Sequence, residues 1–263
     1  MNTRVSSKRV GTVAWAVVAA LVLATPLLTL LVQAAGDRWT GRSILPQAFG
    51  TRGLRRAFDD PLFGPAIRNS TSVAVATVAI ALVLAWPAAR ALARDDRRGL
   101  QLMLLLPLLV PPLAVGEGLT PWFLRLGIAD SLLAIVIAHL VTVLPYVILV
   151  LVGGFTDEVL ESEHAAASLG AGPLRRLVDI TIPAVRRHLG LALALGFTVS
   201  WSQYGSSLAV AGGIPMLPVV LVPFVRSDAQ IAAVLDVVFL LPPLIALSIA
   251  ATLRQHGDRL TIR

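Results

Sequence analysis

Six apolar segments, each long enough to cross a lipid bilayer as a helix, are the feature that most limits how this 263-residue chain can fold. A helix needs about 20 predominantly apolar residues to span the hydrocarbon core of a membrane. The segments are 10–35, 69–90, 99–120, 131–155, 189–212 and 231–253. We therefore expect an all-α integral membrane protein with about six transmembrane helices that form one domain over residues 1–263.

The composition also indicates that lipid is the solvent of much of this chain. Hydrophobic residues make up 56% of it and charged residues only 14%, whereas about a quarter of the residues of a soluble protein are charged. A cleaved signal peptide is the alternative for the segment 10–35, which follows a basic tail. We interpret it as a retained span because its apolar core is longer than that of a signal peptide and no small-residue cleavage site is clear.

The distribution of basic residues predicts the topology. An even number of spans places both termini on one side, and fourteen of the 22 Lys and Arg residues lie on that side, against eight on the other. Basic residues gather in cytoplasmic loops, so we expect both termini to be cytoplasmic. The charges lie in short runs at the ends of apolar spans, where they meet anionic lipid. The net charge of +7 therefore needs no nucleic-acid partner. The outer loop from Gly36 to Arg68 mixes Arg with Asp and Pro, and we expect it to be ordered.

Several enzyme classes find no support in the sequence. There is no cysteine, and Lys8 is the only lysine, with no glycine-rich loop before it. A Walker A loop needs such a lysine to reach the terminal phosphates, so any ATP-driven step must be powered by a partner. The four histidines, at positions 139, 164, 188 and 256, have no metal-ligand spacing. We expect no catalytic residue, no metal site and no cofactor on this chain.

The polar loop 156–188 lies between the fourth and fifth apolar segments. Residues 157–169 favour a short helix with its acids early, where the helix dipole stabilises them. Gly170 occupies a position suited to a left-handed cap, and Gly172-Pro173 turns into a second helix that we expect to end before Pro183. Three alanines, 165–167, make the first helix thin enough to lie in a groove of another protein. The alternative is a connecting helical hairpin that lies on the membrane surface.

The order of residues in this loop resembles the cytoplasmic EAA loop of bacterial ABC-importer permeases. The matching positions are Ala165, Ala166, Gly170, Ala171, Pro173, Ile180, Ile182 and Pro183. The glutamate of the family aligns with His164, and Glu163 lies one residue earlier. One residue turns an α-helix by about 100°, so we do not expect Glu163 to make the contact of the family's glutamate. Asp60-Pro61-Leu62-Phe63 and Val110-Pro111-Pro112 are similar to the family as well.

This resemblance implies a permease subunit in the bacterial inner membrane, with a coupling role for Glu163, His164, Ala165, Ala166, Gly170, Ala171 and Pro183. It also implies the partners: two ATP-binding subunits that hold ATP and Mg, a second permease of the same or a related chain, and an external solute-binding protein. The stretches Ser200–Tyr204 and Met216–Val219 resemble the branch that imports thiamine, polyamines, ferric iron or sulfate.

Candidates for contact with the solute are few. Ionisable groups inside spans are expensive and by default functional, which singles out Glu117 and Asp236. Both are either interfacial carboxylates that reach water or part of a path that favours a cationic solute. Ser202, Gln203 and Tyr204 form a polar patch in the fifth segment, either as interhelical hydrogen-bonding groups or as solute contacts. We interpret His139 as a packing group rather than a ligand.

Two rival functions remain open at this point. An ion-gradient-driven transporter or channel predicts inverted repeats or a relay of buried charges, and neither is evident in the sequence. A membrane scaffold is the other alternative, against which the prolines inside the spans and the intramembrane carboxylates argue.

Overall fold

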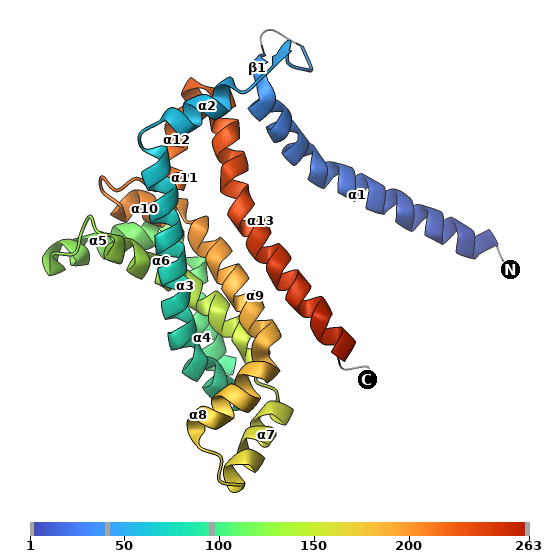
Figure 1. Ribbon diagram of the computed structural model, residues 1–263, viewed down its shortest axis with the longest axis vertical. Helices are drawn as coiled ribbons and strands as arrows, with labels where there is room; N and C mark the ends of the chain where they lie inside the picture. Colours follow the sequence, from blue (N-terminus) through green and yellow to red (C-terminus); the bar gives the residue numbers. More distant parts are fainter. Residues whose placement is uncertain (1–2, 40–42, 95–97, 261–263) are drawn as a thin grey trace. The chain divides into compact units, whose positions relative to one another are not determined.

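The computed structural model describes residues 3–39, 43–94 and 98–260, and it is built almost entirely of helices (Figure 1). The chain divides into two compact units. The first comprises Met1–Pro61 and Leu221–Val238, and the second comprises Leu62–Val220 and Phe239–Arg263. The all-α membrane fold expected from the apolar segments is confirmed.

The first unit joins a long apolar helix to a short outer assembly. Its elements are α1 (Thr3–Ala35), β1 (Gly36–Arg38), β2 (Ala48–Phe49), α2 (Arg52–Asp59), α12 (Val222–Ser227) and the first turns of α13 (Ala229–Leu260). β1 and β2 pair antiparallel, and the Gly50 N–H donates to the Ala35 carbonyl at 2.9 Å. This loop is therefore held by local pairing on both sides of residues 40–42.

The second unit is a bundle around three packed helices, α3, α6 and α9. Its elements are α3 (Phe63–Arg94), α4 (Arg98–Leu109), α5 (Pro112–Leu126), α6 (Leu132–Val152), α7 (Asp157–Ser168), α8 (Pro173–Arg176), the π-helix η1 (Leu177–Thr181), α9 (Ile182–Trp201), α10 (Tyr204–Val210), α11 (Leu217–Val220) and the rest of α13.

Small residues bring the three central helices close together. Ala81, Ala85 and Ala89 repeat every four residues on one face of α3 and are fully buried in the core. A Cβ added to Gly196 of α9 would lie 3.0 Å from Val147 of α6 and 3.3 Å from Val78 of α3. Such close approach of backbones is the usual way in which helices associate in lipid, where apolar burial alone gives no driving force.

The candidate spans differ in part from the six apolar segments. Four helices in the described part of the chain are long and apolar enough to cross a membrane: α1, α3, α6 and α13. The third segment, 99–120, is two helices, α4 and α5, bent by 92°. Pro112 explains the bend, because a residue before proline is driven out of the helical region and Pro111 has ψ 136°.

The fifth segment, 189–212, is also interrupted. α9 ends at Trp201, and α10 begins at Tyr204 after Gln203, whose ψ of 85° is not helical. The count of six spans and the cytoplasmic termini therefore stay predictions. Three of the basic residues used to predict the topology, Arg42, Arg97 and Arg263, lie outside the described residues.

Candidate coupling loop and helix break

The first helix of the loop, α7, begins and ends as the sequence predicts. Asp157 and Glu158 lie in its first turn, and it ends at Ser168. Gly170 has φ +87°, and the Ala171 N–H donates back to the Ala166 carbonyl at 2.9 Å. A Cβ at Gly170 would meet nothing within 4 Å. The left-handed backbone, rather than lack of space, therefore favours glycine here.

The second helix does not end before Pro183, and that prediction is wrong. α8 begins at Pro173, continues through η1 and runs directly into α9, with Pro183 in its first turn. Pro183 has no N–H to donate to the carbonyl four residues earlier. The π-helix absorbs this defect, and the Ile182 N–H donates five residues back to the Leu177 carbonyl.

Glu163 points inward from α7 and His164 points outward. The Glu163 side chain is 1% exposed and is ion-paired with Arg90 near the end of α3. Its second oxygen accepts a hydrogen bond from the hydroxyl of Thr181, the last residue of η1. His164 is exposed, as is Ala165. Glu163 therefore does not share the outward position of His164. Arg90 and Thr181 were missed, although an arginine at the end of an apolar helix was a usable signal.

The outward side of the loop holds a hollow of about 360 Å³. Ala166, Gly170 and Ala171 line it together with Leu169, whose side chain is 89% exposed. Three of the predicted coupling residues thus share one surface. Pro183 is exposed at the base of α9, and neither it nor Glu163 lines this hollow.

His139 bridges the break between α9 and α10. Its Nδ1 lies 2.9 Å from Ser200 Oγ, and its Nε2 lies 3.0 Å from Ser207 Oγ. The Ser207 hydroxyl donates to the Gln203 carbonyl at 2.5 Å, so it must accept from Nε2–H. In the neutral imidazole, Nδ1 is then the acceptor for the Ser200 hydroxyl. His139 is a satisfied packing group, as expected, but its two partners were not predicted.

The polar patch of the fifth segment lies at this break. Gln203 is buried and accepts from the Ser206 hydroxyl at 3.1 Å, whereas Ser202 and Tyr204 on either side of it are exposed. Glu117 is exposed on α5, the helix that packs on α10. Asp236 is half-buried on α13 and belongs to the first unit.

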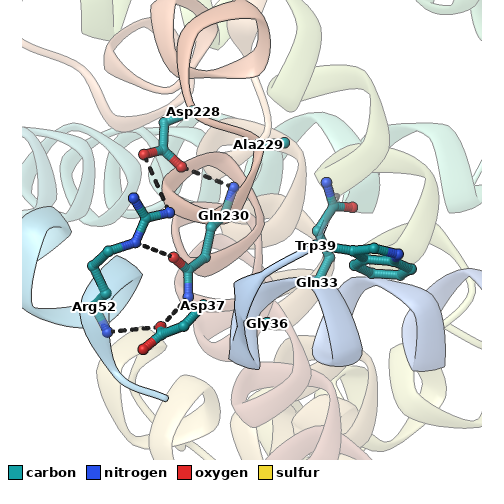
Figure 2. Close-up of a pocket in the computed structure, with 8 residues that line it drawn as sticks. All are labelled: Gln33, Gly36, Asp37, Trp39, Arg52, Asp228, Ala229 and Gln230. Carbon is teal, nitrogen blue, oxygen red and sulfur yellow. Dashed lines mark hydrogen bonds and ion pairs between the residues drawn. The ribbon is translucent and has the colours of Figure 1, made fainter. Parts of the chain in front are cut away.

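A polar pocket of about 410 Å³ in the first unit was not predicted (Figure 2). Arg52 Nε donates to Gln230 Oε1 at 2.9 Å, and Gln230 Nε2 donates to Asp37 Oδ1 at 2.7 Å. Arg52 also pairs with Asp228 at 3.6 Å. Figure 2 shows this chain of side chains on one side of the pocket and Trp39 on the other. The charged residues of the outer loops were its only sequence signal.

Comparison with known proteins identifies the family. No protein-family model matches the chain. A molybdate/tungstate transport system permease from Pyrococcus abyssi is 33% identical over 168 residues, which are 63% of this chain and 67% of the relative. The chain belongs to the ABC transporter permeases.

Two further comparisons agree with this family. The molybdenum transport system permease of Mycobacterium tuberculosis is 32% identical to this permease over 162 residues, 56% of this chain and 61% of the relative. A bacterial ABC transporter involved in the import of alginate matches in structure with a TM-score of 0.71. That match covers 94% of this chain and 97% of the other at 20% identity, which shows the fold alone.

Family membership decides between the rival functions. This ABC transporter permease is a multi-pass protein of the inner membrane and a subunit of an import system. Its relatives are transport permeases and not enzymes. The permease interpretation therefore replaces the gradient-driven transporter and the scaffold.

Proposed function

We propose that this permease forms half of the membrane path of an ATP-driven importer for a small oxyanion. An external solute-binding protein delivers the oxyanion, and a second permease, of the same or a related chain, completes the path. Two ATP-binding subunits, which carry ATP and Mg, dock on the 157–183 loop. The observation that carries this proposal is the hollow beside Leu169, whose side chain is 89% exposed. Leu174 and Val178 of the same loop are exposed as well.

The docking surface comprises His164, Ala165 and Ala166 on α7, and Gly170 and Ala171 in the turn that follows it. Small side chains along this face let a partner approach the helix backbone closely, and Leu169 offers an apolar anchor for a pocket on the partner. Pro183 lies at the base of α9, where it fixes the direction in which α8 leads into the bundle. Glu163 takes no part in this surface because it is buried.

The oxyanion assignment rests on two supports. The relatives are named for molybdate, tungstate and molybdenum transport. Ser202 and Tyr204 are exposed at a helix break. The Ser202 hydroxyl donates to the Val199 carbonyl at 3.2 Å, and the Tyr204 hydroxyl is the neutral donor that binds an anion without trapping it. Gln203 is buried between them and supports the break rather than the solute.

A cationic solute is the second candidate, favoured by the carboxylates Glu117 and Asp236. Glu117 is exposed on α5 and Asp236 is half-buried on α13. If both lined the path, replacing each with its amide would lower uptake. On the oxyanion proposal, Asp236→Asn and Glu117→Gln leave uptake unchanged.

The experiment that tests the proposal starts with the tagged full-length protein, extracted in a mild detergent from its host. Mass spectrometry of the co-purifying proteins should find a Walker-motif ATPase. Cells are then tested for uptake of molybdate, tungstate and a polyamine. Uptake of either oxyanion that requires the ATPase supports the proposal. A preparation without an ATPase, or uptake of the polyamine alone, refutes it.

A further inference from the structure

We propose that Arg90, Glu163 and Thr181 form a buried latch that carries movement of α7 to α3 and α9, and that Glu163 acts inside this chain and not on the ATP-binding subunit. The inference rests on the proposed function, because it assumes that an ATP-binding subunit moves α7. It assigns Arg90 and Thr181 as positioning residues of the transport cycle.

Glu163 differs from the other acids of α7 in its surroundings. Asp157, Glu158 and Glu161 are exposed, and Glu163 is 1% exposed. A buried carboxylate is costly unless it is paired and hydrogen-bonded. Both oxygens of Glu163 are satisfied, one by Arg90 and the other by Thr181. Among the described acids of α7, Glu163 alone is therefore held by bonds to the other helices of the bundle.

The pair with Arg90 attaches α7 to the C-terminal end of α3. The Arg90 side chain is 30% exposed, so the pair is shielded on the Glu163 side and partly open on the other. Leu160 of α7 belongs to the same buried cluster as Ala89 and Leu92 of α3, which keeps water from the carboxylate. Separation of α7 from α3 would break this pair and take Leu160 out of the shared cluster, and breaking a buried pair is strongly unfavourable. The two helices are therefore expected to move together.

Thr181 attaches the same carboxylate to the base of α9. It is the last residue of the π-helix η1, and its hydroxyl also lies 3.2 Å from the Arg176 carbonyl. A π-turn is rare and often marks a functional site. The bond from Thr181 holds this turn against α7. A displacement of α7 thus acts on α3 through one oxygen of Glu163 and on α9 through the other.

The docking surface and the latch lie on different sides of one helix. His164 and Ala165 are exposed, whereas Glu163 and Leu160 are buried. A partner that binds the outer face therefore leaves the latch intact. The partner moves α7 through its contact with the hollow beside Leu169, and α7 in turn moves α3 and α9 through the bonds of Glu163.

The test uses the complete complex, purified with its ATP-binding subunit and reconstituted in liposomes. Glu163→Gln, Arg90→Gln and Thr181→Val each remove one element of the latch. Glu161→Gln and Arg94→Gln are the matched controls, since both residues are exposed on α7 and α3. The two readouts are the amount of co-purified ATP-binding subunit and the amount of molybdate transported per ATP hydrolysed.

We expect the latch variants to retain the ATP-binding subunit and to transport about tenfold less molybdate per ATP, a loss within the usual range of coupling between sites. Arg90→Glu combined with Glu163→Arg should recover part of the coupling, because it restores the ion pair with the two charges exchanged. The two controls should behave as the unchanged protein. If Glu163→Gln does not fold, Thr181→Val gives the answer, because it keeps the ion pair.

Two results would overturn the latch. In one, Glu163→Gln loses the ATP-binding subunit and the charge exchange does not restore it, which would place Glu163 at the docking surface. In the other, the latch variants transport as much per ATP as the controls. Failure of the proposed function is distinguishable from both, since the unchanged protein would then contain no ATP-binding subunit.

Discussion

His139 of α6 and Ser207 of α10 are joined by a hydrogen bond of 3.0 Å. The other ring nitrogen of His139 is hydrogen-bonded to Ser200 of α9, on the opposite side of the interruption between α9 and α10. One side chain thus holds both ends of an interrupted helix. The break positions Ser202 and Tyr204, so the conformation of this candidate solute contact depends on a residue that is itself buried.

The first prediction concerns this bridge. His139→Leu should lower the free energy of unfolding by about 1–3 kcal/mol, because both serine hydroxyls lose a buried partner, and it should reduce uptake. Thr142→Val is the control on the same helix, since the Thr142 hydroxyl is buried without a hydrogen-bond partner among the described residues. Thermal unfolding in detergent measures the effect. Equal unfolding temperatures for both variants would mean that the bridge contributes nothing.

The second prediction concerns the polar pocket of the first unit. Gln230→Leu removes the bonds to Arg52 and Asp37 at once. The loss of both bonds should loosen the outer loop by about 1–3 kcal/mol, although Arg52 keeps its pair with Asp228 and Asp37 still accepts from the Arg52 N–H. Limited proteolysis within residues 36–61 should then be faster by about fivefold or more, since each 1.4 kcal/mol is a factor of ten in the open population. Gln33→Ala, a change on the side of the pocket where Trp39 lies, should leave the rate as it is (Figure 2). Unchanged cleavage of the Gln230 variant would contradict the prediction.

The class of fold could be predicted because the length of the apolar segments alone indicates helices that cross a membrane. Apolar length marks α3 and α6 directly, and acids, Gly170 and Pro173 mark the limits of α7 and the start of α8 through local backbone preferences. These features depend on neighbours in the chain and need no tertiary information.

The features that could not be predicted depend on contacts between distant residues. Glu163 meets Arg90 across 73 positions, and His139 meets Ser207 across 68. The helical course through Pro183 was missed for a different reason: a proline usually ends a helix, and here a π-turn accommodates it. Hydropathy likewise does not show a bend of 92° within an apolar run.

The third prediction concerns the contact between α5 and α10. A Cβ at Gly205 would lie 2.7 Å from the backbone nitrogen of Leu113, and a backbone atom cannot yield as a side chain does. Gly205→Ala should therefore cost about 1–3 kcal/mol of stability. Gly118→Ala, on α5 with nothing within 4 Å of its added Cβ, is the control. Thermal unfolding of both variants decides the matter, and a destabilised Gly118 variant beside a stable Gly205 variant would reverse the assignment.

The fourth prediction uses two glycines that are two residues apart in the coupling loop. Gly170 has φ +87°, where an L-residue costs about 1–2 kcal/mol, and Gly172 has φ −65°, which any residue adopts. A Cβ at either position meets nothing within 4 Å, so backbone conformation alone distinguishes them. Gly170→Ala should weaken co-purification of the ATP-binding subunit, and Gly170→Asp should abolish coupled uptake while the protein stays folded in the membrane. Gly172→Ala should retain both. Each of the three variants changes a single residue of the loop. Normal uptake and ATPase stimulation with Gly170→Asp would therefore show that the loop is not the docking site.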